Sequence, residues 1–269
     1  MQLFKYFIVY ALIVKMRVNK RSNNHMLECH LQLEKIEAKY AILPGDPKRI
    51  DVIKTFLDDA KELNYNREFR TVEGTYKGVK VIACSTGCGG SSTSLAVEEL
   101  IHLGVHTLVR IGSAGALQDD IGLGDLILAE GAIRDDGASK TYVDPIYPAA
   151  PDHDVLSAII ESCKEKGFPY HTGIVQSHET FYHDDNPKQE EYWSKLGVLG
   201  SDFESAALFV IGRIRKARCA SILNNVVLYG QDTSESVAEY ATGESMTAIG
   251  ERREIEAALE AFYKLENAG

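Results

Sequence analysis

The sequence predicts one α/β domain, because short β-branched or aliphatic runs end in glycine-containing turns and are followed by stretches with helical spacing. Its 269 residues could form one large domain or two small ones, and a 45% hydrophobic share supplies a sizeable core. No internal repeat or low-complexity linker interrupts the alternation. We therefore expect a single domain over residues 26–269.

In the first half, the apolar runs predict strands over residues 40–43, 79–85 and 107–111, each followed by glycine. Helices are expected over about 48–57 and after the second of these strands, where Leu95, Val97, Leu100 and Ile101 have helical spacing. Further strands are expected over residues 125–133, 173–177 and 221–229.

Helical spacing also marks residues 202–215 and 244–265, and the Glu, Lys, Arg and Ala content of the second range suits a solvent-facing terminal helix. Residues 183–192 are polar and contain proline. Such a stretch is expected to be a mobile flap or an inert surface loop.

Composition excludes several classes of protein. The net charge of −10 disfavours a nucleic-acid partner. Five cysteines without paired spacing argue against a secreted disulfide framework and favour a reducing, cytoplasmic location. No zinc-binding spacing is present.

The first 25 residues differ from the rest, with five basic residues and no acidic ones. The apolar run 6–14 is too short to span a bilayer, so no membrane partner is expected. The run could be a weak signal-like segment. We favour an upstream extension, with Met26 as the natural start and residues 1–25 outside the fold.

Glycine follows three of the expected strands, at Gly45, at residues 87–90, and at Gly112 and Gly115. The strand ends of an open α/β sheet form a ligand crevice, and glycine lets backbone N–H groups approach an anion closely. Ordinary turn chemistry also places glycine there.

Two arginines accompany these glycines, Arg49 after Gly45 and Arg110 just before Gly112. A guanidinium at a buried strand end must meet a carboxylate or a bound anion. A salt bridge satisfies the first requirement, and a phosphate clamp that includes Ser113 satisfies the second.

Five motifs in order resemble those of the nucleoside phosphorylases, and most closely the bacterial uridine phosphorylases. They are PGDP with Arg49, NREF at 66–69, STGCGGSSTS at 85–94, RIGS at 110–113, and DFESA at 202–206. The resemblance implies a three-layer α/β/α fold with a mixed central sheet. It covers nearly everything after Met26.

The resemblance also implies site residues. Inorganic phosphate would be held by Gly45, Arg49, Arg110, Ser113 and, from a neighbouring subunit, Arg67. Ribose would be held by Glu204, Phe203 and an adjacent subunit's His30, and the base by Phe181 and Gln189. A monovalent cation such as K⁺ would lie at the subunit interface on Glu68, Cys88 and Ser92.

Three of these residues also have plainer interpretations. Glutamate is common near a helix start because of the helix dipole, which would explain Glu204 without a ligand. His30 could be a surface histidine, and Phe181 could belong to the core.

The implied reaction is phosphorolysis of a nucleoside to ribose 1-phosphate and a free base, in nucleoside catabolism, with Arg110 and Glu204 as its principal residues. Phosphate is the co-substrate and no cofactor is required. Residues shared between subunits imply a homo-oligomer, a hexamer built as a trimer of dimers.

Uridine is the expected substrate, which would place the enzyme in pyrimidine salvage. Purine-cleaving relatives carry an aspartate after the late strand, where this chain has residues 226–230 (VVLYG), although Asp232 lies slightly beyond. Glu191 stands where a base-reading arginine is usual, so either Lys188 or a backbone group substitutes, or the preference has shifted away from plain uridine. The alternatives are a purine nucleoside phosphorylase, a nucleosidase that uses water, and a non-catalytic nucleoside-binding protein.

Overall fold

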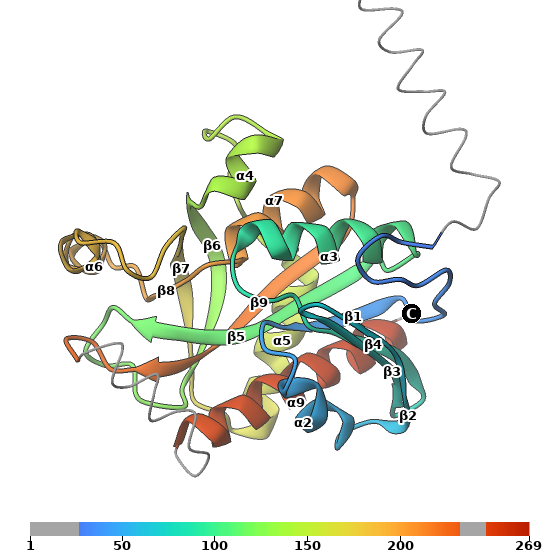
Figure 1. Ribbon diagram of the computed structural model, residues 1–269. Helices are drawn as coiled ribbons and strands as arrows, with labels where there is room; N and C mark the ends of the chain where they lie inside the picture. The colour runs from blue at the N-terminus through green and yellow to red at the C-terminus, as the bar shows by residue number, and fades with distance from the viewer. Residues whose placement is uncertain (1–26, 232–245, 269) are drawn as a thin grey trace, which may run out of the picture.

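A computed structural model describes residues 27–231 and 246–268, and one mixed sheet organises them (Figure 1). Its strands run in the order β2-β3-β4-β1-β5-β8-β7-β6-β9, with parallel and antiparallel neighbours. They are β1 Tyr40–Pro44, β2 Asp58–Asn66, β3 Phe69–Tyr76, β4 Val79–Cys84, β5 Thr107–Ala116, β6 Leu126–Asp135, β7 Tyr170–His178, β8 Gly200–Asp202 and β9 Arg218–Val227.

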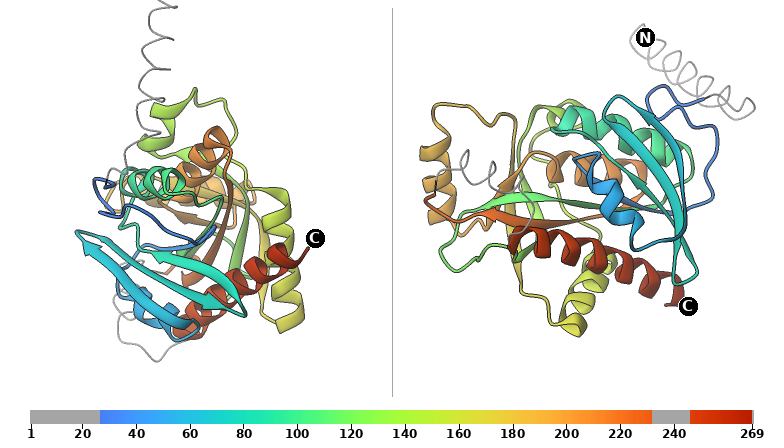
Figure 2. Two further views of the ribbon diagram at one scale, coloured as in Figure 1. Left: turned by 90° about the vertical axis from the view of Figure 1, so that its right-hand side faces the viewer. Right: turned by 60° about the horizontal axis from the view of Figure 1, so that its bottom comes forward.

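Helices cover both faces of this sheet, which confirms the three-layer α/β/α architecture (Figures 1 and 2). One face carries α3 Gly90–His102, α4 Gly137–Tyr142 and α7 Ser205–Arg215. The other carries α2 Arg49–Lys54, α5 His153–Lys166 and α9 Met246–Asn267. Helix α6, Asn186–Lys195, stands apart at one end. Within the described ranges, no helix is long and apolar enough to cross a bilayer.

Strand β1 shows how the sequence produces two cores. Side chains alternate between the faces of a strand, so Ala41 and Leu43 join the core under α3 and α7. Tyr40 and Ile42 join the core under α2, α5 and α9. All of β1 is buried, as expected for a central strand covered on both faces.

The sheet partly closes on itself, because β9 pairs with both β6 and β5. Along one edge, β5 pairs with β9 from Thr107 to Gly115. Along the other, it pairs with β1 only as far as Ile111 and with β8 only from Gly115. Residues 112–114 therefore lie where β1 and β8 diverge, and such a divergence is where α/β sheets commonly bind ligands.

Three features differ from the sequence-based expectation. Strands β2 and β3 were not expected, because β2 is polar and mostly exposed and so has no apolar alternation. Residues 183–192 were expected to be a flap or loop, but α6 begins at Asn186, where proline in the first turn is compatible with a helix. Asp202 ends β8, and the helix starts only at Ser205.

The other expected elements are present, with β5 extending to Ala116. The terminal helix is described from Met246. Residues 1–25, Glu244 and Asp232 lie outside the described residues.

The contact between β5 and β8 depends on glycine. A Cβ at Gly200 would lie 2.8 Å from Cδ1 of Ile127 and 2.9 Å from the carbonyl oxygen of Gly115. We expect Gly200→Ala to lower the free energy of unfolding by about 2 kcal/mol, because the backbone carbonyl of Gly115 cannot easily retreat. Chemical denaturation measures this change.

Gly115→Ala is the matched control, because a Cβ there would meet nothing closer than 3.8 Å. It should cost little or slightly stabilise the protein. Equal losses in the two variants would contradict the proposed clash.

Candidate active site

Arg110 lies in the middle of β5 and is buried, with only 6% of its side chain exposed. Its Nε donates to Oδ2 of Asp202 at 2.9 Å, and its Nη2 lies 2.5 Å from Oε2 of Glu204. A Cβ at Gly112 would overlap this guanidinium, at 2.5 Å from Nη2. Glycine therefore makes room for the arginine to fold back along its own strand, and the salt bridge expected of a buried arginine is present.

The two carboxylates that meet Arg110 also organise the start of α7. Asp202 accepts hydrogen bonds from the backbone N–H and the hydroxyl of Ser205, at 3.0 and 2.6 Å. Glu204 accepts from the backbone N–H of Gly89 at 2.6 Å. Burial raises the pKa of the Glu204 carboxyl, although Arg110 and the N–H donors oppose this shift.

The glycine-containing loops after β1 and β4 lie side by side. The N–H of Gly87 donates to the carbonyl of Gly45 at 3.0 Å, and a Cβ at Gly45 would come within 3.2 Å of the Gly87 carbonyl oxygen. Gly87 and Gly89 both have positive φ, 72° and 95°, which glycine adopts without strain. The loop after β4 thereby brings the backbone N–H of Gly89 to Glu204.

Arg49, from α2, reaches the same segment of β5 from the other side. Its Nη2 donates to Oγ of Ser113 at 2.6 Å, and its Nη1 donates to Oε1 of Glu254 at 3.0 Å. Arg49 at Ser113 and Arg110 at Gly112 therefore both lie against the same short segment of β5. The site adds acidic partners to the two arginines, with Glu254 and Glu251 both paired to Arg49.

Aromatic rings gather beside Glu204. The ring centroids of Phe203 and His178 are 4.6 Å apart, and those of Phe203 and Phe181 are 6.4 Å apart. Burial lowers the pKa of the His178 imidazole, which favours its neutral form. Phe181 and Phe203, both predicted from the sequence, thus form an apolar surface next to the carboxylate.

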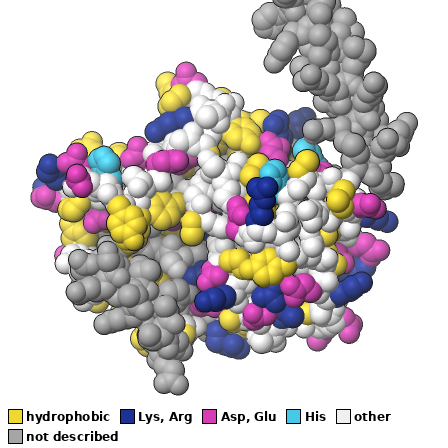
Figure 3. Space-filling model, viewed as in Figure 1, with side chains coloured by type: hydrophobic (Ala, Val, Ile, Leu, Met, Phe, Trp, Pro, Cys, Tyr) yellow, Lys and Arg dark blue, Asp and Glu magenta, His cyan; other side chains and the backbone are white. Residues whose placement is uncertain are grey.

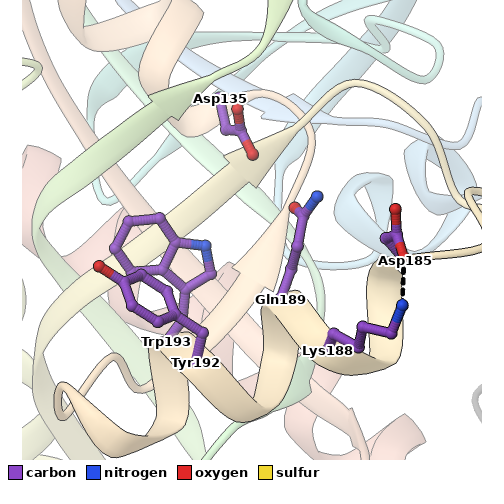
Figure 4. Close-up of a pocket in the computed structure, with 6 residues that line it drawn as sticks. All are labelled: Asp135, Asp185, Lys188, Gln189, Tyr192 and Trp193. Atoms are coloured by element: carbon purple, nitrogen blue, oxygen red, sulfur yellow. Dashed lines mark hydrogen bonds and ion pairs between the residues drawn. The ribbon is translucent and has the colours of Figure 1, made fainter.

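A cavity of about 470 Å³ lies against α6 (Figure 4). It is lined by Asp135, Asp185, Lys188, Gln189, Tyr192 and Trp193. Lys188 is engaged by Asp185, with 2.8 Å between Nζ and Oδ1. Glu191 does not line this cavity: it is exposed and paired with Lys195. Lys188, not Glu191, therefore accompanies Gln189.

The surface around α6 is rich in hydrophobic side chains (Figure 3). Tyr182 is 85% exposed, Tyr192 57% and Leu196 60%. Helix α6 itself has no buried residue. Its attachment to the domain is therefore slight compared with that of the strands that carry Arg110 and Glu204.

His30 and Arg67 lie near each other, because Asn66, the neighbour of Arg67, contacts His30. Among the described residues, neither forms a hydrogen bond or ion pair with Arg49 or Arg110. Nδ1 of His30 is 2.6 Å from Oε1 of Glu99, and its carbonyl accepts from the side chain of Asn66 at 2.8 Å. Arg67, next to Asn66, is exposed and forms no ion pair with any described residue. The structure does not bring either side chain into contact with Arg49, Arg110 or Glu204.

The residues suggested for a monovalent cation are partly assembled. Oγ of Ser92 donates to Oε1 of Glu68 at 2.9 Å, so two oxygen ligands lie together. Cys88 is exposed, and its thiol has no hydrogen bond to either of them among the described residues. The described ranges contain no cluster of three His, Cys, Asp or Glu residues suited to a metal ion.

Comparison with known proteins identifies the family to which the chain belongs. Residues 39–245 match the family described as Phosphorylase superfamily, and this range includes both arginines, the glycine loops and Glu204. The chain belongs to the phosphorylase superfamily.

Within this superfamily, the chain is 37% identical over 230 residues to a uridine phosphorylase of Thermococcus kodakarensis, which covers 80% of this chain and 83% of that protein. It is 35% identical over 211 residues to a guanosine phosphorylase of Halorubrum lacusprofundi, covering 77% and 87%. The crystal structure of a uridine phosphorylase from Vibrio fischeri ES114 superposes with a TM-score of 0.83 at 40% identity, covering 90% of this chain and 99% of that one.

Sequence analysis did not identify three groups in the candidate site of this superfamily member. They are His178, Glu254, and Asp202 in its role as the partner of Arg110. Asp202 could have been found, because a buried arginine needs a carboxylate and DFES lies in a motif already noted. His178 directly precedes the ETFY segment. Glu254 gave no signal, because acidic residues are abundant in the terminal helix.

The buried Glu254 should make stability depend on pH. Burial raises the pKa of its carboxyl to about 8, opposed by Arg49 and Arg110 and assisted by Glu251. The folded state therefore holds a proton that the unfolded state has lost, so this contribution to stability is present below about pH 4.5 and is lost as pH rises through about 8. Between these limits it changes by at most about 1.4 kcal/mol per pH unit.

We expect Glu254→Gln to flatten the decline of the unfolding free energy between pH 5 and 8, measured by denaturant titration without phosphate. Glu191→Gln is the control, because that carboxyl is exposed and Lys195 lowers its pKa out of this window. An unchanged slope in Glu254→Gln would contradict the assignment.

Proposed function

We propose that this protein cleaves uridine with inorganic phosphate, giving uracil and ribose 1-phosphate. The observation that carries this proposal is the convergence of Arg49 and Arg110 on Gly112 and Ser113, beside Glu204 and the Phe203–Phe181 surface. The two cations suit phosphate, the carboxylate suits the ribose hydroxyls, and the aromatic surface suits the base. Uridine phosphorylases among its relatives support the choice of base.

Phosphate is proposed to bind to Arg49, Arg110, Ser113 and the Gly45 loop. Arg110 uses Nε and Nη2 for Asp202 and Glu204, and its Nη1 makes no hydrogen bond to any described residue. That nitrogen can therefore meet an anion without breaking the salt bridges. A phosphate dianion held there would both attack C1′ and stabilise the positive charge that develops on the ribose ring as the base leaves.

Glu204 is proposed to accept hydrogen bonds from the ribose. A carboxylate has about four lone-pair sites. Gly89, Phe203 and Arg110 already contact Glu204. One ribose hydroxyl can therefore bind while the present contacts persist. The base would lie against Phe181 and Phe203, with Gln189 in the adjacent cavity supplying an amide.

Release of uracil from uridine should require phosphate, because the proposed nucleophile is phosphate and not water. Chromatography of uridine incubated with and without phosphate measures this. Arg110→Ala should lower kcat/KM by about a hundredfold or more, as loss of a preorganised charge does. Arg215→Ala, which removes an exposed partner of Glu98, is the matched control.

Equal cleavage with and without phosphate would indicate a nucleosidase, and binding without turnover a nucleoside-binding protein. A guanosine phosphorylase among the relatives and the outward-facing Glu191 make a purine nucleoside the second candidate. Phosphate-dependent cleavage of guanosine or inosine, with uridine intact, would favour it.

A homo-oligomer with shared sites, a hexamer built from dimers, is also proposed. It is supported by Arg67, which is exposed and lacks an ion pair to any described residue of its own chain, and by its proximity to His30. The oxygen ligands of Glu68 and Ser92 suit K⁺ at such an interface, and Cys88 belongs to the neighbouring glycine loop. The five free cysteines support a cytoplasmic location.

Shared sites lead to a complementation test. Arg67→Ala and Arg110→Ala should each be nearly inactive alone, because each removes a phosphate ligand from every site. Mixed oligomers would contain some sites that draw an intact Arg67 from one subunit and an intact Arg110 from the other. Activity should therefore reappear after subunit exchange. If mass spectrometry demonstrates subunit exchange and activity still does not recover, each site lies within one chain.

A further inference from the structure

The carboxyl group of Glu254 is fully buried, on the face of α9 that packs against the sheet. Its neighbours Ile255 and Ala258 belong to the apolar core beneath α9. A carboxyl group in such surroundings is costly to bury, and burial raises its pKa to about 8. Its position therefore calls for an explanation other than packing.

Glu254 connects two elements of the proposed phosphate site. Its Oε1 accepts from Nη1 of Arg49 at 3.0 Å, and its Oε2 accepts from the backbone N–H of Gly112 at 3.1 Å. Gly112 lies where β1 and β8 diverge, so on that edge no strand pairs with it, and a carboxyl oxygen of Glu254 supplies the acceptor. One side chain thus links α2 to the site segment of β5.

The same contacts fix the direction of the Arg49 guanidinium. Nη1 is held by Glu254, and Nη2 is held by Ser113 at 2.6 Å. Oε2 of Glu251 lies 3.3 Å from Nε of Arg49, but Glu251 is partly exposed, and the N–H of Gly112 donates to Glu254 instead. A planar guanidinium held at two or more nitrogens loses most of its rotational freedom before a ligand arrives.

We propose that Glu254 is a positioning residue for phosphate: it holds Arg49 and the Gly112–Ser113 backbone in the arrangement that receives the anion. This inference rests on the proposed function only in taking Arg49 and Ser113 as phosphate ligands. Among the described residues, Glu254 makes no hydrogen bond to Glu204 or Phe203, the residues proposed for the ribose. Its effect is therefore confined to phosphate use.

The test compares Glu254→Gln with Glu256→Gln in the full-length enzyme, by steady-state kinetics with phosphate and nucleoside varied separately. The glutamine is isosteric and its amide oxygen still accepts, but its amide nitrogen can only donate, so either Arg49 or Gly112 loses its acceptor. Glu254→Gln should raise KM for phosphate about tenfold, as loss of a buried hydrogen bond at a charged group does. KM for the nucleoside and kcat should stay within about threefold.

Glu256→Gln, on the same helix but paired with Lys166 and not with Arg49, should change every constant by less than about threefold. If Glu254→Gln does not fold, Glu254→Asp applies the same criteria, because it keeps the carboxyl group but is too short to reach both partners. Parallel changes in kcat and both KM values, or a phosphate KM that is unchanged or lower, would overturn the proposal. A wild-type enzyme that cleaves nucleoside without phosphate would overturn the proposed function, and this inference with it.

Discussion

The burial of one positive charge organises the site. Arg110 projects from a central strand that is covered on both faces, so its guanidinium cannot be hydrated and needs carboxylates at short distance. Asp202 and Glu204 meet that need. Asp202 also holds the first turn of α7, and Glu204 holds the loop before α3. The same two carboxylates that neutralise Arg110 thus also hold the starts of α7 and α3 in place.

The sheet supplies the space in which these groups meet. Strand β5 is paired along one edge throughout, but its other edge is shared by β1 and β8, which separate at residues 112–114. Backbone groups in this interval are free to meet side chains, and Gly112 meets Glu254. A fully paired strand would have used those groups for the sheet. The interruption of pairing is therefore what makes an interior ligand site compatible with a continuous core.

Sequence reasoning recovered the parts of this arrangement that follow from local pattern. Buried strands, glycine turns and Arg110 beside Gly112 are recognisable because each leaves a contiguous signature. Strand β2 was missed because its polar, exposed residues carry no period. Glu254 was missed because its partner Gly112 lies 142 residues away in the sequence, and only the folded chain shows which of many acidic residues is buried. Long-range electrostatic pairing has no local signature.

Helix α6 and the strands around Arg110 differ greatly in burial. The helix has no buried residue, whereas β5 pairs along both edges and is buried from Thr107 to Gly112. Substitutions in α6 are therefore tolerated at little cost to folding, and those in β5 are not. Substitutions along α6 would thus change the part of the protein proposed to meet the base and retain the part proposed to meet phosphate.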